Sequence, residues 1–250
     1  MNGANVTIPQ GALMPSPTHR IRLWDLPTRL FHWLLAFLIV AAIVTGKIGG
    51  NAMVWHGRIG LAILGLVAFR VAWGLVGSTY ARFASFLPTP SSIAAYVRGQ
   101  WSGLGHNPLG ALSVLGLLAM IALQVGTGLF TNDDIAFRGP LFSLVDKSFS
   151  DALTSLHRLS INGLIVLIVL HLCAIAFYAH VKKDNLVKPM ITGWKDVEPG
   201  QVSRALDGGG AIAVLFSLGV AVAAVYAASG AWLPDAKPEA PAATQQAPAW

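Results

Sequence analysis

Long apolar runs separated by short polar segments make up most of this chain of 250 residues. Five of the runs are long enough to cross about 30 Å of hydrocarbon as helices. They lie at residues 30–48, 54–76, 109–130, 156–181 and 211–230. Backbone groups inside a bilayer must find their hydrogen bonds within the protein, which favours a helix for each run. We therefore expect an all-α fold, an integral membrane bundle of five transmembrane helices.

The composition agrees with a lipid environment. Apolar residues make up 54% of the chain, charged residues make up 11%, and the mean hydropathy is +0.61. These values exclude an ordinary soluble domain. We expect a cytoplasmic N-terminal arm over residues 1–29 and a four-helix core over 30–195. A connecting loop with the fifth helix should follow over 196–230, and then a flexible Pro/Ala-rich tail over 231–250.

The distribution of positive charge predicts the orientation. Four cations lie outside the runs on one side of the expected membrane, and ten lie on the side of the N-terminal arm. These ten are Arg20, Arg22, Arg29, Arg82, Arg98, Lys182, Lys183, Lys188, Lys195 and Arg204. Positively charged loops stay inside, so the N-terminus should be cytoplasmic and the C-terminus periplasmic. The cations of the cytoplasmic segments account for the net charge of +6, so this charge gives no support to nucleic-acid binding.

Apart from His180 at the end of its run, four histidines lie within or at the start of the apolar runs, where a histidine is costly enough to need a function. His157 and His171 are fourteen residues apart in one run. Fourteen residues come to within about 40° of four full turns, so both imidazoles leave the same helix face, about 21 Å apart. His32 lies at the inner start of its run and His56 at the outer start of the next. Depth therefore pairs His56 with His157 and His32 with His171.

Two separated histidine pairs predict haem in preference to zinc. Zinc usually takes four ligands, and neither pair has a nearby cysteine or carboxylate to complete its set. A haem ring supplies four nitrogens itself and leaves two axial positions for histidines from facing helices. The sequence has no CxxCH motif, so any haem is held without thioether bonds. We predict two non-covalent b-type haems within the four-helix core, with His32, His56, His157 and His171 as iron ligands.

Three arginines are candidates for binding haem propionates. Arg70 follows His56 by fourteen residues and so shares its face at the inner level. Snorkelling to the cytoplasmic interface explains Arg70 equally well. Arg58 and Arg158 lie within two residues of an outer ligand and are similar candidates. The small residues that could admit a porphyrin edge, or only allow close helix packing, are Gly57, Gly60, Gly65, Gly74, Gly116, Gly126 and Gly128.

Several stretches resemble the bacterial cytochrome b561 family, which includes the b-type subunits of nickel-iron hydrogenases. They include RLWDLPTRLFHWLLAFLIVAAIVTG, WHGRIGLAILGLVAFRVAWG, GHNPLGALSVLGLLAM and TGLFTNDDIAFRGPL, and the resemblance covers residues 20–195. It implies a di-haem, quinone-linked cytochrome of the bacterial inner membrane, with the four histidines as ligands. It also implies a membrane quinone as substrate, and a periplasmic cytochrome c or a partner of the dehydrogenase or hydrogenase type.

The leading hypothesis is therefore an electron carrier between the quinone pool and a periplasmic protein. One alternative is a stand-alone oxidoreductase that acts on a small species such as superoxide at the outer haem. Another is a transporter that uses the histidines as a metal or proton relay. The sequence leaves open whether the chain is an enzyme by itself, as well as the direction of electron flow.

Overall fold

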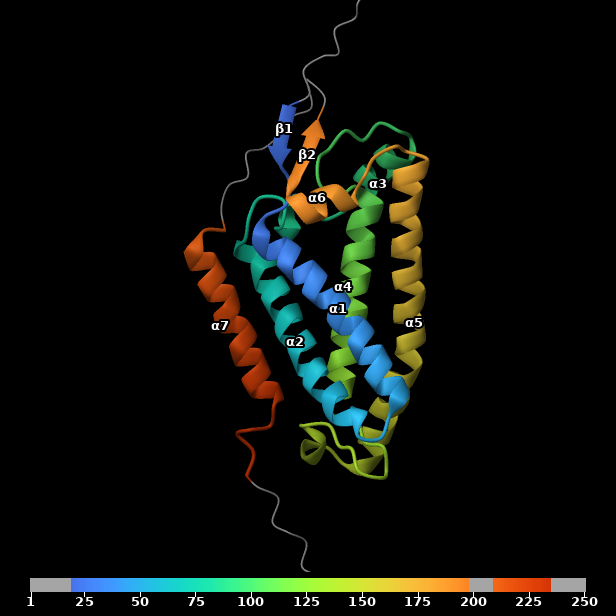
Figure 1. The fold of residues 1–250 in the computed structure, drawn as a ribbon, viewed down its shortest axis with the longest axis vertical. Helices are drawn as coiled ribbons and strands as arrows, with labels where there is room; N and C mark the ends of the chain where they lie inside the picture. Colours follow the sequence, from blue (N-terminus) through green and yellow to red (C-terminus); the bar gives the residue numbers. More distant parts are fainter. Residues whose placement is uncertain (1–18, 198–208, 235–250) are drawn as a thin grey trace, which may run out of the picture.

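The computed structural model describes residues 19–197 and 209–234. Within them, five helices are long and apolar enough to span a membrane: α1 (Leu26–Ile48), α2 (Ala52–Val76), α4 (Pro108–Gly128), α5 (Lys147–His180) and α7 (Ala211–Ala228). Figure 1 shows the first four as a bundle, with α7 outside it beside α2. The expected fold class, a membrane bundle of five helices, is confirmed.

Two of the helices begin earlier than the apolar runs suggest, because acidic residues cap them. Asp25 accepts a hydrogen bond of 2.6 Å from the Thr28 amide, so α1 begins at Leu26 and not at residue 30. Asp146 accepts one of 2.9 Å from the Phe149 amide, so α5 begins nine residues before the predicted span. With 34 residues α5 is about 50 Å long, which exceeds the hydrocarbon thickness.

Short elements that the hydropathy pattern does not predict gather at one end of the bundle, which we call the sheet end (Figure 1, top). There β1 (His19–Arg22) pairs antiparallel with β2 (Trp194–Val197), beside α3 (Pro90–Val97) and α6 (Val187–Thr192). The pairing joins the predicted N-terminal arm to the end of the predicted core. Two 3₁₀ turns are η1 (Phe83–Ser85) and η2 (Phe142–Leu144). We call the opposite end, formed by residues 129–146, the loop end.

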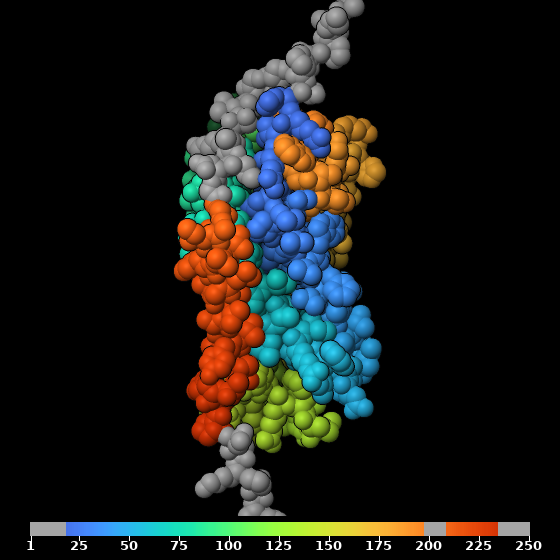
Figure 2. Space-filling view, turned by 60° about the vertical axis from the view of Figure 1, so that its left-hand side comes forward, coloured from blue at the N-terminus to red at the C-terminus, as the bar shows by residue number. Residues whose placement is uncertain are grey.

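Helix α2 lies at the centre of the packing. It contacts α1, α4 and α7, while α5 packs along α4. The buried core between these helices includes Phe31, Leu35, Ile63, Trp73, Ile121, Val125 and Leu164. The outward faces are apolar as well: Phe37 is 70% exposed, Leu75 67% and Ile212 85%. Apolar outward faces of this kind are expected for helices that are surrounded by lipid. In Figure 2, α7 lies lengthwise against the bundle. The predicted tail falls mostly outside the described residues.

Candidate haem centres

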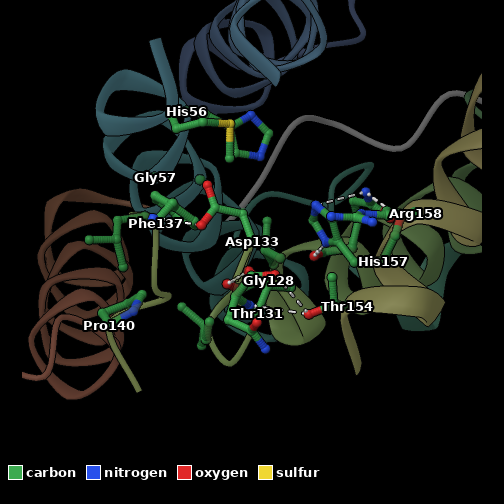
Figure 3. Close-up of a pocket in the computed structure, with 17 residues that line it drawn as sticks. His56, Gly57, Gly128, Thr131, Asp133, Phe137, Pro140, Thr154, His157 and Arg158 are labelled. Carbon is green, nitrogen blue, oxygen red and sulfur yellow. Dashed lines mark hydrogen bonds between the residues drawn. The ribbon is translucent and has the colours of Figure 1, made fainter. Parts of the chain in front are cut away.

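His56 and His157 lie at the same cavity near the loop end (Figure 3). Their ring centroids are 6.1 Å apart and their planes are at 90°. An iron between two imidazole nitrogens needs two bonds of about 2 Å, and each ring centre lies about 1 Å behind its nitrogen, for a total of about 6 Å. The spacing of this outer pair therefore fits one iron with two axial histidines.

Backbone carbonyls hold both rings of the outer pair. His56 Nδ1 lies 2.9 Å from the carbonyl oxygen of Ala42, and His157 Nδ1 lies 2.9 Å from that of Gln124. A carbonyl only accepts, so each Nδ1 carries the proton and donates it. The lone pair of each Nε2 is then left for a metal, which is the usual arrangement behind a ligating histidine.

Two glycines leave room for these rings. A Cβ at Gly46 would lie 3.0 Å from His56 Nδ1, and one at Gly128 would lie 3.1 Å from His157 Cε1. Helix packing explains Gly65, where a Cβ would meet Val225 of α7 at 2.9 Å. Of the predicted glycines, Gly65 thus serves helix packing and Gly128 leaves room for a histidine ring. Three other predicted glycines have open space beside them, because a Cβ would have no neighbouring atom within 4 Å: Gly60, Gly116 and Gly126.

The cavity beside the outer pair has a volume of about 110 Å³. This is smaller than the 300–1,000 Å³ or so that is typical of cofactor pockets, so flexible lining side chains such as Met53 and Leu61 must turn aside for a porphyrin. Arg158 lines this cavity. Arg58 does not, and its guanidinium lies 5.1 Å from the centre of the Trp55 ring. Of the two predicted arginines, the structure brings only Arg158 to the outer pair.

The inner pair lies at the sheet end. His32 of α1 and His171 of α5 line one cavity of about 410 Å³, a volume within the range of cofactor pockets. His32 Nδ1 is buried and has no hydrogen-bond partner. The structure thus brings together the two histidine pairs that depth predicted, and it holds the outer pair more firmly. The role of all four as iron ligands remains a prediction.

Comparison with known proteins places the chain in a family. The sequence matches the prokaryotic cytochrome b561 family over residues 23–193. The chain belongs to this family. This cytochrome is therefore a multi-pass membrane protein that binds haem b and transfers electrons. Helix α7 lies outside the matched range.

The sequence identity of the chain to individual relatives is low, but the matched regions cover most of each relative. A protein of Azotobacter chroococcum mcd 1 named "Probable Ni/Fe-hydrogenase B-type cytochrome subunit" is 25% identical over 218 residues, 70% of this chain and 88% of the relative. One of Escherichia coli strain K12 named "Probable Ni/Fe-hydrogenase 1 B-type cytochrome subunit" is 20% identical over 221 residues, 73% of this chain and 93% of the relative. No solved structure matches the cytochrome.

The inner cavity of the cytochrome contains polar groups that sequence reasoning missed. The hydroxyl of Tyr178 bonds to that of Tyr96, and Asn107 Nδ2 donates to it at 2.6 Å. Tyr178 follows His171 by two helical turns and so shares its face, a spacing that could have identified it. No comparable local signal points to Tyr96, because α3 meets α5 only through the tertiary fold.

His106, in the loop before α4, also lines the inner cavity. Its ring lies between those of Trp24 and Phe86, with centroids 4.7 Å from each. Burial, and then the positive charge of Arg70, lower the pKa of His106 to about 3. The imidazole is therefore neutral at physiological pH.

Arg70 is buried, at 3% exposed, so it does not snorkel to water. Its guanidinium lies 4.9 Å from the centre of the Phe83 ring, and Nη1 has no hydrogen-bond partner. Asp25 lies near enough to attract it. Arg70 is not itself part of the cavity lining, but its charge acts on His106, which is.

Proposed function

We propose that this cytochrome carries electrons between membrane quinone and a redox partner at the outer face, with one haem b at each histidine pair. The observation that supports this most strongly is the outer pair, with its 6.1 Å spacing and both Nδ1 atoms held by carbonyls. Haem, when bound, supplies a reversible one-electron carrier. The protein's part is to present two neutral Nε2 atoms at the right separation and to exclude water.

Filling both axial positions favours electron transfer over chemistry on a small molecule. If each pair holds one haem, its two imidazoles would leave no open iron position for a species such as superoxide. All four histidines are half-buried on apolar spanning helices, which points the same way, because such surroundings would separate an iron from solvent.

We assign the quinone to the sheet end, beside the inner pair. The hydroxyls of Tyr96 and Tyr178 and the amide of Asn107 are donors of the kind that quinone carbonyl oxygens accept. Aromatic rings such as that of Trp33 provide the apolar walls that cofactor pockets usually have. The excess of cations on this side supports its assignment to the cytoplasmic face of a bacterial inner membrane.

We place the protein partner at the loop end. Two relatives carry names that describe subunits of nickel-iron hydrogenases. By that similarity, the partner is a hydrogenase-type or other dehydrogenase, or a cytochrome c, that meets the outer haem at the periplasmic face. Arg158, exposed at the rim of the outer cavity, lies on the surface such a partner would cover.

Haem stoichiometry tests the proposal. Purified protein should contain two haems b per chain, both extractable with acid acetone, and quinol should reduce them. One haem per chain, or a haem that resists extraction, would contradict it. Turnover of superoxide without any partner protein would instead support the stand-alone oxidoreductase.

Ligand variants test the pairing. His56→Ala and His157→Ala should each remove the outer haem and leave the inner one, so that haem content falls to about one per chain. His32→Ala and His171→Ala should remove the other haem. The reduced spectra and potentials should then fall into two groups. If His56→Ala and His171→Ala lose the same spectral component, the pairing by depth is wrong.

A further inference from the structure

Gln124 contacts both nitrogens of the His157 ring. Its backbone oxygen accepts from His157 Nδ1 at 2.9 Å, and its side-chain Nε2 lies 3.3 Å from His157 Nε2. Since Nδ1 carries the ring proton, Nε2 can only accept, and the Gln124 amide is the donor. The amide nitrogen thus lies beside the ring nitrogen that an iron would use.

Two further hydrogen bonds fix the direction of this amide. Ser160 Oγ donates to Gln124 Oε1 at 2.5 Å, and Gln124 Nε2 donates to the His157 backbone oxygen at 3.1 Å. Ser160 is 8% exposed, so no water competes freely for these groups. The negative end of the amide dipole is therefore anchored at Ser160, and the positive end faces the outer centre.

We propose that Gln124 is a positioning residue of the outer haem, which presents the His157 ring and raises the midpoint potential with its amide donor. The proposal rests on the proposed ligand role of His56 and His157. An iron on His157 Nε2 would replace the 3.3 Å contact, whereas the hydrogen bonds of the amide to Ser160 and to the His157 carbonyl involve no atom that an iron would take. Oxidised iron carries one more positive charge than reduced iron, so a nearby positive dipole end favours the reduced form.

Spectroelectrochemical titration of full-length purified variants tests this role. Gln124→Met keeps the approximate volume but removes the donor, and it should lower the outer haem's potential while the inner potential stays unchanged. Ser160→Ala only releases the anchor, so it should lower the outer potential less. Ser217→Ala is the matched control, because Ser217 is also a buried hydroxyl on a spanning helix but lies on α7. It should leave both potentials unmoved.

The two haems are assigned beforehand with His56→Ala and His32→Ala. If His56→Ala removes no distinct component, the proposed function has failed, whatever the Gln124 variants do. If the assignment succeeds and Gln124→Met binds both haems with an unmoved outer potential, the role of Gln124 is overturned. If Gln124→Met loses the outer haem, Ser160→Ala decides: a lowered potential supports the role, and an unmoved one overturns it.

Discussion

Arg70 places a guanidinium inside the bundle, where charge acts over longer distances than at a surface. Arg70→Leu should lower the inner haem's potential on the order of 50 mV, because an interaction of about 1.4 kcal/mol corresponds to about 59 mV for one electron. Arg70→Lys should retain part of the effect, since the charge survives but the planar fork does not.

A redox titration of both variants measures this effect, with the outer haem as an internal control. The outer potential should stay nearly constant, because about 21 Å separates the two levels. An unmoved inner potential in Arg70→Leu would mean that Arg70 serves only the packing between Asp25 and Phe83.

His106 predicts a dependence of stability on pH. Its pKa is about 3 in the folded protein against an ordinary 6.5, so between these values the unfolded chain binds more protons. Acidification through this window therefore destabilises the fold. His106→Phe preserves the ring between Trp24 and Phe86 but cannot titrate. Between pH 7 and pH 5 the melting temperature of this variant should fall less than that of the unchanged protein, by about 4–8 °C. Parallel melting curves that stay superimposed across this range would show that His106 contributes nothing to it.

At the level of the helices, α4 offers a matched pair of glycines. Gly128→Val should displace the His157 ring, because even a Cβ at this position would lie 3.1 Å from Cε1. Outer haem content should drop below about half while the inner haem remains. Gly126→Val is the control, because a Cβ there meets nothing within 4 Å. Haem content by pyridine haemochrome measures both, and equal content in the two variants would argue against close packing on His157.

The helices were predictable from sequence because hydropathy and the spacing of His157 and His171 are local properties of one segment. The N-caps at Asp25 and Asp146 make two helices longer than their apolar runs. Capping is also a local property of the sequence, but a hydropathy pattern does not contain it. Pairing of β1 with β2 depends on residues more than 170 positions apart, and no periodicity reveals it. The places of His106 and Gln124 in the sites likewise follow only from how helices pack.

The orientation of the whole molecule is a prediction from charge alone. Five spans and a cytoplasmic N-terminus place the C-terminus outside. Alkaline phosphatase fused after Trp250 should be active in a bacterial host, and green fluorescent protein fused there should stay dark. The same reporters fused after Val181 should behave in the opposite way, since the sheet end lies inside. Bright fluorescence from the C-terminal fusion would reverse the assignment of both ends.

One helix, α5, contributes a histidine to each pair. The order in which the ribosome makes the helices therefore determines when each pair is complete. When the ribosome has made α1 and α2, the chain contains His32 and His56 but neither of their partners. At about 5–20 residues per second, the roughly 115 residues from His56 to His171 take several seconds to appear. During that interval the half-made chain exposes two unpaired imidazoles to the membrane. Under the proposed ligand roles, cofactor loading therefore waits for nearly complete translation, and a chain that stalls before α5 should mature at neither centre.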